Sequence, residues 1–269
     1  MKRRNNLEGR WAIVTGASGG IGFEFCRVLA SMKCNLLMTA IEDTLLEERA
    51  AEIQASCGVK AVPLTLDLTD PSAPGKILQA TDELGAEPYI LVNNAGVFTF
   101  SPVTEHSDRK IDLFIDLHIR SLTVLCRELA VRMAQNGEGR ILNMSSMSCW
   151  MPMPGIAMYS ATKAYIRVLS RAMHYELKDS GVSVTVACPG GIATDLFGLP
   201  PKLQRLAVRL GVLAKPDVFA RKAVVRMLKG RKQYVNGLLN RLSIFFVAIT
   251  PTPVRMMVKR RMLDRGVRV

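Results

Sequence analysis

The sequence predicts an α/β fold built on a doubly wound, parallel sheet. Short apolar runs rich in Val, Ile and Leu recur along the chain, as strands buried on both faces of a sheet require. Longer stretches with helical periodicity separate these runs, and a glycine-rich turn directly follows the first one. Alternation of this kind is typical of parallel sheets that are covered by helices.

The expected strands and helices alternate between residues 11 and 190. Strands are expected at 11–16, 35–40, 60–67, 89–96, 140–146 and 182–190, and helices at 20–33, 43–56, 107–135 and 157–180. Neither a repeat nor a linker is apparent in the sequence before about residue 200. We therefore predict one domain over residues 1–237, followed by an extension over 238–269. Right-handed crossovers would place a ligand outside the carboxyl ends of the strands.

Positive charge is concentrated in the last quarter of the chain. The 269 residues carry a net charge of +13, yet residues 1–199 hold 19 Lys and Arg against 21 Asp and Glu, which is −2. Residues 200–269 hold 17 Lys and Arg against 2 Asp and Glu, which is a net charge of +15. Such asymmetry indicates an anionic partner. Nucleic acid is disfavoured, because no aromatic side chains are interleaved with the charges of the tail.

The cysteines and the N-terminus indicate a cytoplasmic protein. The basic N-terminus lacks a long apolar segment and is a poor secretory signal, and no apolar stretch approaches the roughly eighteen residues of a spanning helix. Peripheral association with a membrane stays open. The cysteines lack a C-x-x-C pair, so we expect buried thiols and no metal site. They are Cys26, Cys34, Cys57, Cys126, Cys149 and Cys188.

The glycine-rich turn "TGASGGIG" (15–22) follows the first strand and opens a helix. Gly16, Gly20 and Gly22 would let the backbone turn tightly and approach a pyrophosphate, while the helix N-terminus supplies N–H groups. A glycine turn without a ligand is the alternative. The position between strand and helix favours phosphate binding.

Six motifs together resemble the short-chain dehydrogenase/reductase family over about residues 10–237. They are "TGASGGIG", "LDLTD" (66–70), "NNAG" (93–96), "NMSS" (143–146), "YSATK" (159–163) and "CPGGIAT" (188–194). The resemblance implies a Rossmann-type domain that transfers hydride between a nicotinamide and a carbonyl or alcohol. It also implies a homodimer or homotetramer.

The resemblance assigns cofactor-binding roles to matching positions. Asp67 would bind the adenine, "NNAG" would support the cofactor's ribose and the central sheet, and Thr194 would hold the nicotinamide carboxamide. The full expected set is Gly16, Ser18, Gly20, Ile21, Gly22, Ala40, Asp67, Leu68, Asn94, Ala95, Gly96, Tyr159, Lys163, Pro189, Gly190, Ile192 and Thr194.

Tyr159 and Lys163 are the expected acid–base pair. They are four residues apart and share one helix face. A free tyrosine titrates near pH ~10, too high for acid–base catalysis near neutrality. An ammonium group and a helix N-terminus nearby both stabilise the phenolate, so Lys163 should lower the pKa of Tyr159. Ser146, expected to end the fifth strand, would orient the substrate oxygen.

His118 departs from the family pattern. An asparagine usually occupies this position in the helix before the fifth strand and anchors a water that relays protons to the lysine. Aligning "DLHIRSLTVLC" (116–126) places His118 there. A neutral imidazole both donates and accepts, so His118 is a candidate for the relay. A hydrogen-bonded core histidine is the equal alternative.

The residues after the second strand favour NADP over NAD. NAD-selective members usually place an Asp at its end, where it bonds the ribose 2′-hydroxyl. Here Ala40 and Ile41 occupy the two deciding positions. Glu42 and Asp43 follow closely, and no basic clamp is visible in the sequence, so NAD stays open.

Five methionines surround the catalytic serine and precede the tyrosine. They indicate a pocket for an extended apolar ligand, with simple core filling as the alternative. A substrate lid is expected at about 195–215, with Leu203, Leu206, Leu210 and Leu213 on one face and Lys202, Arg205 and Arg209 around the other. The methionines are Met144, Met147, Met151, Met153 and Met158.

The extension consists of an apolar run, a Pro-Thr-Pro break and a basic segment over 238–263. It is too short and too interrupted to span a bilayer. It would lie on an anionic membrane surface, with Phe245 and Phe246 inserted, or else form a dimer interface or a cover over the active site.

The sequence therefore predicts an NAD(P)-dependent oxidoreductase of the ketone/secondary-alcohol type. A membrane-facing tail and a methionine-rich pocket favour a lipid-like ketone, for example a 3-keto-sphingoid base, a 3-oxoacyl chain or a steroid. The alternative is a non-catalytic dinucleotide-binding sensor or scaffold. Retention of Ser146, Tyr159 and Lys163 argues against it, because a sensor has no use for all three.

Overall fold

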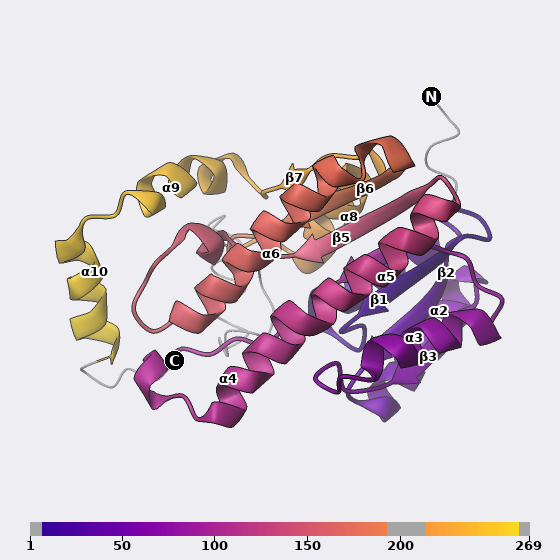
Figure 1. Ribbon diagram of the computed structural model, residues 1–269, viewed down its shortest axis with the longest axis horizontal. Helices are drawn as coiled ribbons and strands as arrows, with labels where there is room; N and C mark the ends of the chain where they lie inside the picture. The colour runs from indigo at the N-terminus through magenta and orange to yellow at the C-terminus, as the bar shows by residue number, and fades with distance from the viewer. Residues whose placement is uncertain (1–6, 193–212, 264–269) are drawn as a thin grey trace.

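A computed structural model describes residues 7–192 and 213–263 of the protein (Figure 1). Seven strands, parallel throughout, form one sheet in the order β3-β2-β1-β4-β5-β6-β7. The strand order reverses between β1 and β4, as in a doubly wound sheet, which confirms the predicted fold class. The strands are β1 (Trp11–Thr15), β2 (Asn35–Ala40), β3 (Ala61–Thr65), β4 (Pro88–Asn93), β5 (Gly139–Met144), β6 (Val182–Ala187) and β7 (Gln233–Tyr234).

Helices cover both faces of the sheet. Alternate residues of β1 point to opposite sides: Ala12 and Val14 belong to the core shared with α1 and α8, whereas Ile13 belongs to the core shared with α5 and α6. The helices are α1 (Gly20–Ser31), α2 (Asp43–Cys57), α3 (Ala73–Glu83), α4 (Asp108–Ile115), α5 (Leu122–Gln135), α6 (Ala157–Glu176), α8 (Pro216–Leu228), α9 (Leu238–Ala248) and α10 (Thr252–Val258).

Several strands end earlier than predicted. The runs at 60–67, 89–96, 140–146 and 182–190 leave the sheet at Thr65, Asn93, Met144 and Ala187. Each run continues into glycine-rich or polar residues, which form loops beyond the last ladder hydrogen bond. Because parallel strands end at one edge, these loops meet there, and they carry most of the predicted site residues.

The predicted helix over 107–135 is one helical run with an irregularity. α4 passes into a π-helical segment, η3 (Asp116–Ser121), which continues directly into α5. Single π turns inside α-helices occur frequently at functional sites. This one carries His118, whose side chain is fully buried.

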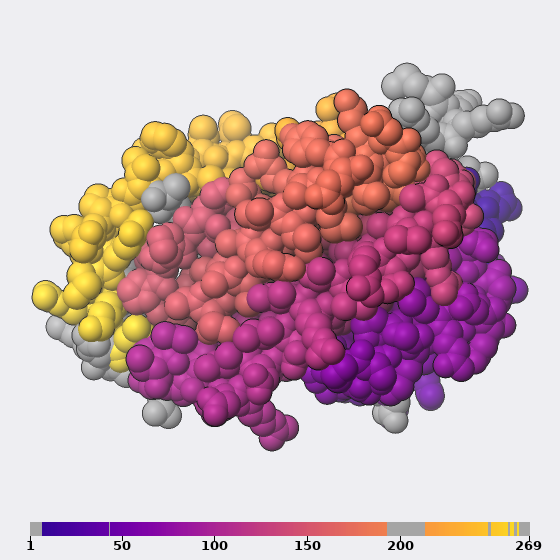
Figure 2. Space-filling model, viewed as in Figure 1, coloured from indigo at the N-terminus to yellow at the C-terminus, as the bar shows by residue number. Residues whose placement is uncertain are grey.

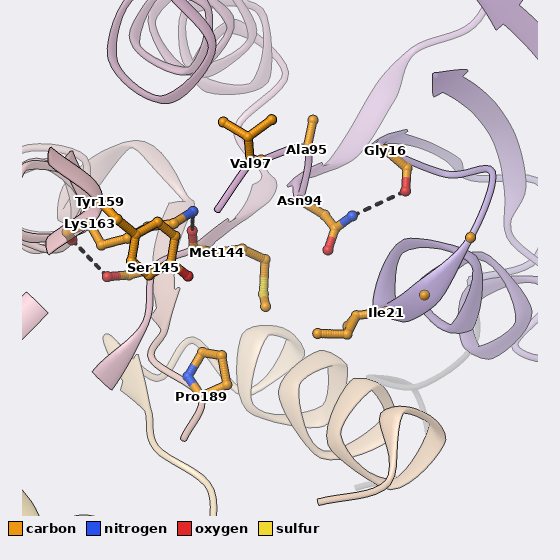
Figure 3. A pocket seen from close by; sticks show the side chains of 13 residues that line it. Gly16, Ile21, Asn94, Ala95, Val97, Met144, Ser145, Tyr159, Lys163 and Pro189 are labelled. Atoms are coloured by element: carbon orange, nitrogen blue, oxygen red, sulfur yellow. Dashed lines mark hydrogen bonds between the residues drawn. The ribbon is translucent and has the colours of Figure 1, made fainter. Parts of the chain in front are cut away.

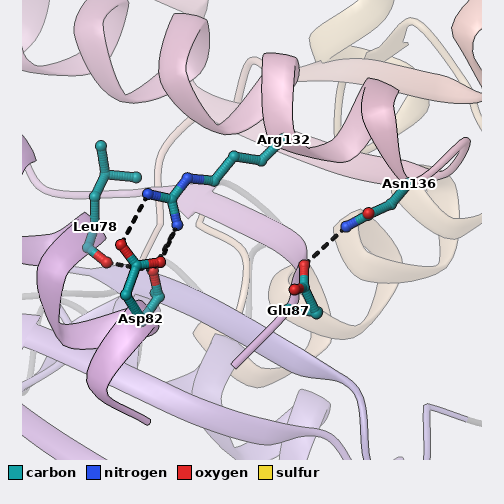
Figure 4. Close-up of polar contacts among 6 residues, drawn as sticks. Leu78, Asp82, Glu87, Arg132 and Asn136 are labelled. Atoms are coloured by element: carbon teal, nitrogen blue, oxygen red, sulfur yellow. Dashed lines mark hydrogen bonds and ion pairs between the residues drawn. The ribbon is translucent and has the colours of Figure 1, made fainter. Parts of the chain in front are cut away.

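Polar contacts at the surface tie α5 to its neighbours (Figure 4). The Arg132 guanidinium donates to both carboxylate oxygens of Asp82 at the end of α3, and it lowers the pKa of that carboxyl. Asn136 Nδ2 donates to Glu87, which precedes β4, at 2.8 Å. Exposed pairs of this kind contribute little stability, so the buried faces of the helices carry the packing.

The C-terminal extension runs along the outside of the domain (Figure 2). After β7 the chain forms α9, α10 and a π-helical turn, η7 (Lys259–Leu263). Within the described ranges, every helix falls short of the length and apolar character that crossing a membrane requires. The helix α9 contacts the segment that follows β5, so the extension packs against the domain. The predicted boundary between domain and extension at residue 237 therefore stays a proposal. Of the expected lid, residues 195–212 lie outside the described residues.

Candidate active site

A cavity of about 310 Å³ opens at the carboxyl ends of β1, β4 and β5, where the strand order reverses (Figure 3). Ligands of doubly wound sheets bind at this kind of position. The cavity is lined by Gly16, Gly19, Gly20, Ile21, Asn94, Ala95, Gly96, Val97, Met144, Ser145, Tyr159, Lys163 and Pro189.

The glycine loop fits a phosphate group. Gly16 has φ +64°, and a Cβ there would lie 3.0 Å from Ala95 Cα. A Cβ at Gly22 would lie 1.9 Å from the Gly16 carbonyl oxygen, so only glycine allows α1 to approach the loop this closely. Gly19 precedes α1, and no described side chain caps that N-terminus. Its N–H groups and positive potential therefore face the cavity, which is the arrangement that binds anions.

The residues at the end of β4 brace this loop. The Thr15 hydroxyl accepts hydrogen bonds from the backbone N–H groups of Asn94 at 3.0 Å and Ala95 at 3.1 Å. Asn94 Nδ2 donates to the carbonyl oxygen of Thr15 at 3.1 Å and to that of Gly16 at 3.1 Å, and Figure 3 shows the second of these bonds. The part of "NNAG" that follows β4 thus fixes the spacing between the ends of β1 and β4.

Tyr159 and Lys163 project from the first turns of α6 toward the cavity. Both side chains are buried, and Lys163 Nζ lies 5.6 Å from the centre of the Tyr159 ring. Lys163 Nζ donates to the Met144 carbonyl oxygen at 3.0 Å, and the Ser145 hydroxyl donates to the Lys163 carbonyl oxygen at 2.7 Å (Figure 3). The end of β5 therefore holds the lysine in place.

The predicted lowering of the Tyr159 pKa is wrong for the chain as it stands. Burial raises the pKa of Tyr159 to about 12, although the Ser146 hydroxyl acts in the opposite direction. Burial also lowers the pKa of Lys163 to about 8. The nearest hydrogen-bonding partner of the ammonium group is the Met144 carbonyl, so loss of water outweighs any stabilisation of the phenolate by Lys163.

The sequence predicted that Ser146 ends the fifth strand. In the structure it lies two residues beyond the end of β5. It caps a short 3₁₀ helix, η4 (Met147–Trp150), and its Oγ accepts a hydrogen bond from the Ser148 N–H at 3.1 Å. Its hydroxyl also interacts with the Tyr159 phenol, where it favours the ionised form. The serine and the tyrosine thus share one side of the site.

Both ring nitrogens of His118 have partners. Nε2 accepts from the Val97 N–H at 3.0 Å, so the proton is on Nδ1, which lies 2.9 Å from Thr162 Oγ1. The Thr162 hydroxyl in turn donates to the Tyr159 carbonyl oxygen at 3.0 Å. Burial, together with the charge of Lys163, lowers the pKa of His118 to about 2. This neutral imidazole supports α6 and the loop after β4, and its part in a relay stays a prediction.

Asp67, expected to bind the adenine, and Ala40, expected beside the ribose 2′-position, lie outside the cavity. Ala40 is buried at the end of β2, and the following Ile41 is 67% exposed. Asp67 is exposed, and one of its oxygens accepts from the Thr69 N–H at 2.8 Å. Leu68 is packed in the core. Ser18 and Gly22 belong to the glycine loop but do not line the cavity.

The turn after β6 is held by the residues that follow β7, including the start of the C-terminal extension. Pro189 lines the cavity, and the Gly190 N–H donates to Asn236 Oδ1 at 2.8 Å. A Cβ at Gly190 would lie 2.5 Å from Asn240 Nδ2, so the extension packs directly on this glycine. Ile192 is buried and bridges to Ala214. Thr194 lies outside the described residues.

The five methionines do not line one pocket. Met144 lines the cavity, Met151 and Met153 line a second cavity described below, and Met147 and Met158 line neither. Sequence reasoning also missed Gly19, Val97, Ser145 and Asn236. Gly19 and Ser145 belong to the motifs already identified and could have been predicted from them. Nothing in the sequence linked Asn236 to Gly190, 46 residues away.

Among the cysteines, four are buried as predicted, whereas Cys57 and Cys149 are half-buried. Cys149 lies on η4, close to the site, and Cys57 ends α2 on the far side of the sheet.

Comparisons with known proteins agree with this geometry. A family model described as short chain dehydrogenase matches residues 10–200. A short-chain type dehydrogenase/reductase from Picea abies is 30% identical, over 78% of this chain and 80% of its own. A very-long-chain 3-oxoacyl-CoA reductase from Anas platyrhynchos is 29% identical, over 91% and 77%. Inactive hydroxysteroid dehydrogenase-like protein 1 from Homo sapiens is 31% identical, over 80% and 65%.

Among solved structures, a short-chain dehydrogenase from Sphingobium yanoikuyae in complex with NADPH matches 94% of this chain and 95% of its own. The TM-score is 0.77 and the identity 26%. The family model covers well over half of the residues, and its range contains the glycine loop, Ser146, Tyr159 and Lys163. The chain therefore belongs to the short-chain dehydrogenase family.

Proposed function

We propose that the protein is an NADP-dependent reductase of an apolar, lipid-like ketone. The observation that carries this proposal is the placement of Tyr159 and Lys163 on the wall of one cavity, opposite an uncapped helix N-terminus, with Ser146 beside the phenol. A bound nicotinamide cofactor would supply hydride to the carbonyl carbon. The residues of the chain bind and orient the reactants and deliver the proton.

The protonation states favour reduction over oxidation. A phenol whose pKa is about 12 keeps its proton near neutral pH, which is the state that a proton donor needs. Tyr159 would give this proton to the substrate oxygen as the alcohol forms, while Ser146 orients that oxygen. The Lys163 ammonium, charged below a pKa of about 8, would stabilise the phenolate left behind.

The cofactor proposal rests on the glycine loop and on Ala40. The loop and the N-terminus of α1 would hold the pyrophosphate, and Asn94 and Lys163 would hold the nicotinamide half beside them. Because Ala40 ends β2 without a carboxylate, nothing at that position repels a 2′-phosphate. The Sphingobium relative was solved with NADPH. The roles of Ser18, Asp67, Leu68, Gly190, Ile192 and Thr194 remain part of the proposal.

The substrate proposal rests on the relatives. The Anas relative is a very-long-chain 3-oxoacyl-CoA reductase, and a 27% identical relative from Rickettsia conorii is a 3-oxoacyl-[acyl-carrier-protein] reductase. A 3-oxoacyl chain is therefore the first candidate, before a 3-keto-sphingoid base or a steroid. We also propose that the protein forms a homodimer or homotetramer.

A non-catalytic dinucleotide-binding protein is the second candidate. It is favoured by one observation, the similarity to a human relative whose name describes it as inactive. The presence of Tyr159, Lys163 and Ser146 together opposes it. NADPH consumption with 3-oxo compounds of graded chain length separates the two candidates.

Replacement of Tyr159 by Phe should lower turnover by about 10²–10⁴-fold, because the proton donor is lost. NADPH affinity should stay close to that of the wild type, since the ring remains. Tyr165→Phe is the matched control: it lies on the same helix, and its hydroxyl contacts Thr123 Oγ1 at 2.8 Å, away from the cavity. Turnover by Tyr159→Phe at the level of the control would contradict the assignment.

The rate of ketone reduction should fall as pH rises through about 8, because Lys163 then loses the proton that stabilises the phenolate. His118 should add no second step near neutrality, since it stays neutral above a pKa of about 2. The measurement is kcat between pH 6 and about pH 10 with saturating substrates, in the range where these groups titrate. A flat profile across this interval would show that Lys163 is not the titrating group.

Cofactor preference is tested at the end of β2. The wild type should bind NADPH more tightly than NADH, and Ala40→Asp should reverse the order, because a carboxylate accepts the 2′-hydroxyl and repels a 2′-phosphate. Fluorescence titration with each reduced cofactor measures both affinities. Tighter binding of NADH by the wild type would refute the preference.

Contact with an anionic membrane is the proposed role of α9. Its apolar side chains form one exposed face, with Phe245 66% and Phe246 67% exposed and their rings in edge contact. The other members of this face are Leu238, Leu239 and Leu242, with Ile249 directly after the helix. Exposed basic residues include Arg241 on the same helix and Lys259 and Arg260 after α10. An exposed apolar face in a basic segment suits the surface of an anionic bilayer.

The full-length protein should co-sediment with anionic but not with zwitterionic vesicles, and salt should release it. Each basic residue near the surface contributes about 1 kcal/mol. Replacing both Phe245 and Phe246 by Ser should weaken sedimentation. The same change at the exposed Val131 and Val168 of α5 and α6 should not. Indifference of the wild type to anionic vesicles at low salt would leave α9 as a dimer interface or a cover.

A further inference from the structure

A second cavity, of about 690 Å³, lies between η4, the loop that follows it, α6 and α10. In Figure 1, α10 lies beside the loop that leads into α6. The described residues that line this cavity are all different from those of the first one. They are Ser148, Cys149, Trp150, Met151, Pro152, Met153, Pro154, Ala157, Ser160, Ala161, Ala164, Thr252, Arg255 and Met256.

The wall of this cavity is largely apolar. Met151, Met153 and Met256 supply flexible side chains from two segments that are far apart in the sequence. Trp150 is held by the Arg167 guanidinium, which lies 4.5 Å from its ring centre. The volume is within the range of about 300–1,000 Å³ that is usual for small-molecule sites.

Three polar groups in the wall lack partners. The Oγ atoms of Ser148 and Ser160 and the Nε of Arg255 are shielded from solvent and have no hydrogen-bond partner among the described residues. The two serines are 6% and 7% exposed. A buried hydroxyl or N–H without a partner is unfavourable, so these residues of the wall are not fully satisfied by the packing around them.

The charge of the lining residues indicates which charge the ligand carries. Arg255 is the cation of the lining, and the described lining residues include no Asp or Glu. The Arg255 guanidinium matches a carboxylate, while the methionines and Trp150 match a hydrocarbon chain.

We propose that this cavity is a binding site for an anionic single-chain amphiphile of the long-chain carboxylate type. The head group is held by Arg255, and the chain lies along Trp150 and the methionines. The site does not depend on the reductase activity, because its residues are separate from those of the first cavity. A ligand bound in this cavity contacts both α10 and the segment that begins directly after Ser146.

Calorimetric titration with decanoate, below its micelle concentration and without cofactor, tests the proposal. Decanoate should bind saturably at one site per chain and at least about tenfold more tightly than 1-decanol, a difference of ~1.4 kcal/mol. Inorganic phosphate should bind more weakly than decanoate. Fluorescence of Trp150, measured in a Trp11→Phe background, should change on binding, because Trp150 lines the cavity and Trp11 lies in the core.

Arg255→Met should remove the preference for decanoate over decanol, whereas Arg260→Met, an exposed position on the following turn, should keep it. Ala161→Phe should block both ligands, whereas Ala172→Phe, on an exposed part of the same helix, should not. Equal binding of decanoate and decanol, an undiminished preference in Arg255→Met, or full binding in Ala161→Phe would overturn the proposal. So would phosphate binding as tight as that of decanoate.

Discussion

The buried ammonium group of Lys163 is the constraint on which the site depends. Removing a charge from water costs several kcal/mol unless polar partners replace the lost hydration. The Met144 carbonyl oxygen, 3.0 Å from Lys163 Nζ, is such a partner. It is available because β5 ends at the point where α6 crosses this strand. The bond from Ser145 Oγ to the Lys163 carbonyl fixes the same crossing from the backbone side. The position of Tyr159, one helical turn earlier, follows from this crossing.

The burial that positions the pair also determines its acid–base chemistry. Loss of water disfavours the charged form of each group, so the pKa of Tyr159 rises and that of Lys163 falls. Between the two values the phenol is protonated and the ammonium becomes neutral as pH increases. A site built in this way is prepared to donate a proton, and any lowering of the Tyr159 pKa must come from what the cavity binds.

Local patterns in the sequence were enough for the sheet, the glycine loop and the spacing of Tyr159 and Lys163. These features depend on residues that are neighbours along the chain, through strand and helix periodicity. The sequence did not indicate the π turn around His118 or the Asn236 bond to Gly190, because both depend on packing between distant segments. The predicted direction of the Tyr159 pKa shift was wrong for the same reason, because this shift depends on how completely other elements cover the ring.

The C-terminal extension contacts the domain through different side chains from those it presents to solvent. Asn240 packs on Gly190, Ile244 packs against the core, and Arg241 Nε donates to the Val235 carbonyl oxygen at 3.2 Å, so these residues attach α9 to the domain. Phe245 and Phe246 take no part in that attachment and remain exposed. Arg255 and Met256 of α10 instead face the second cavity. Internal packing thus explains neither the exposed apolar face of α9 nor the unpaired polar groups beneath α10. Because the two features share no residue, a membrane surface at one and an amphiphile at the other are physically independent.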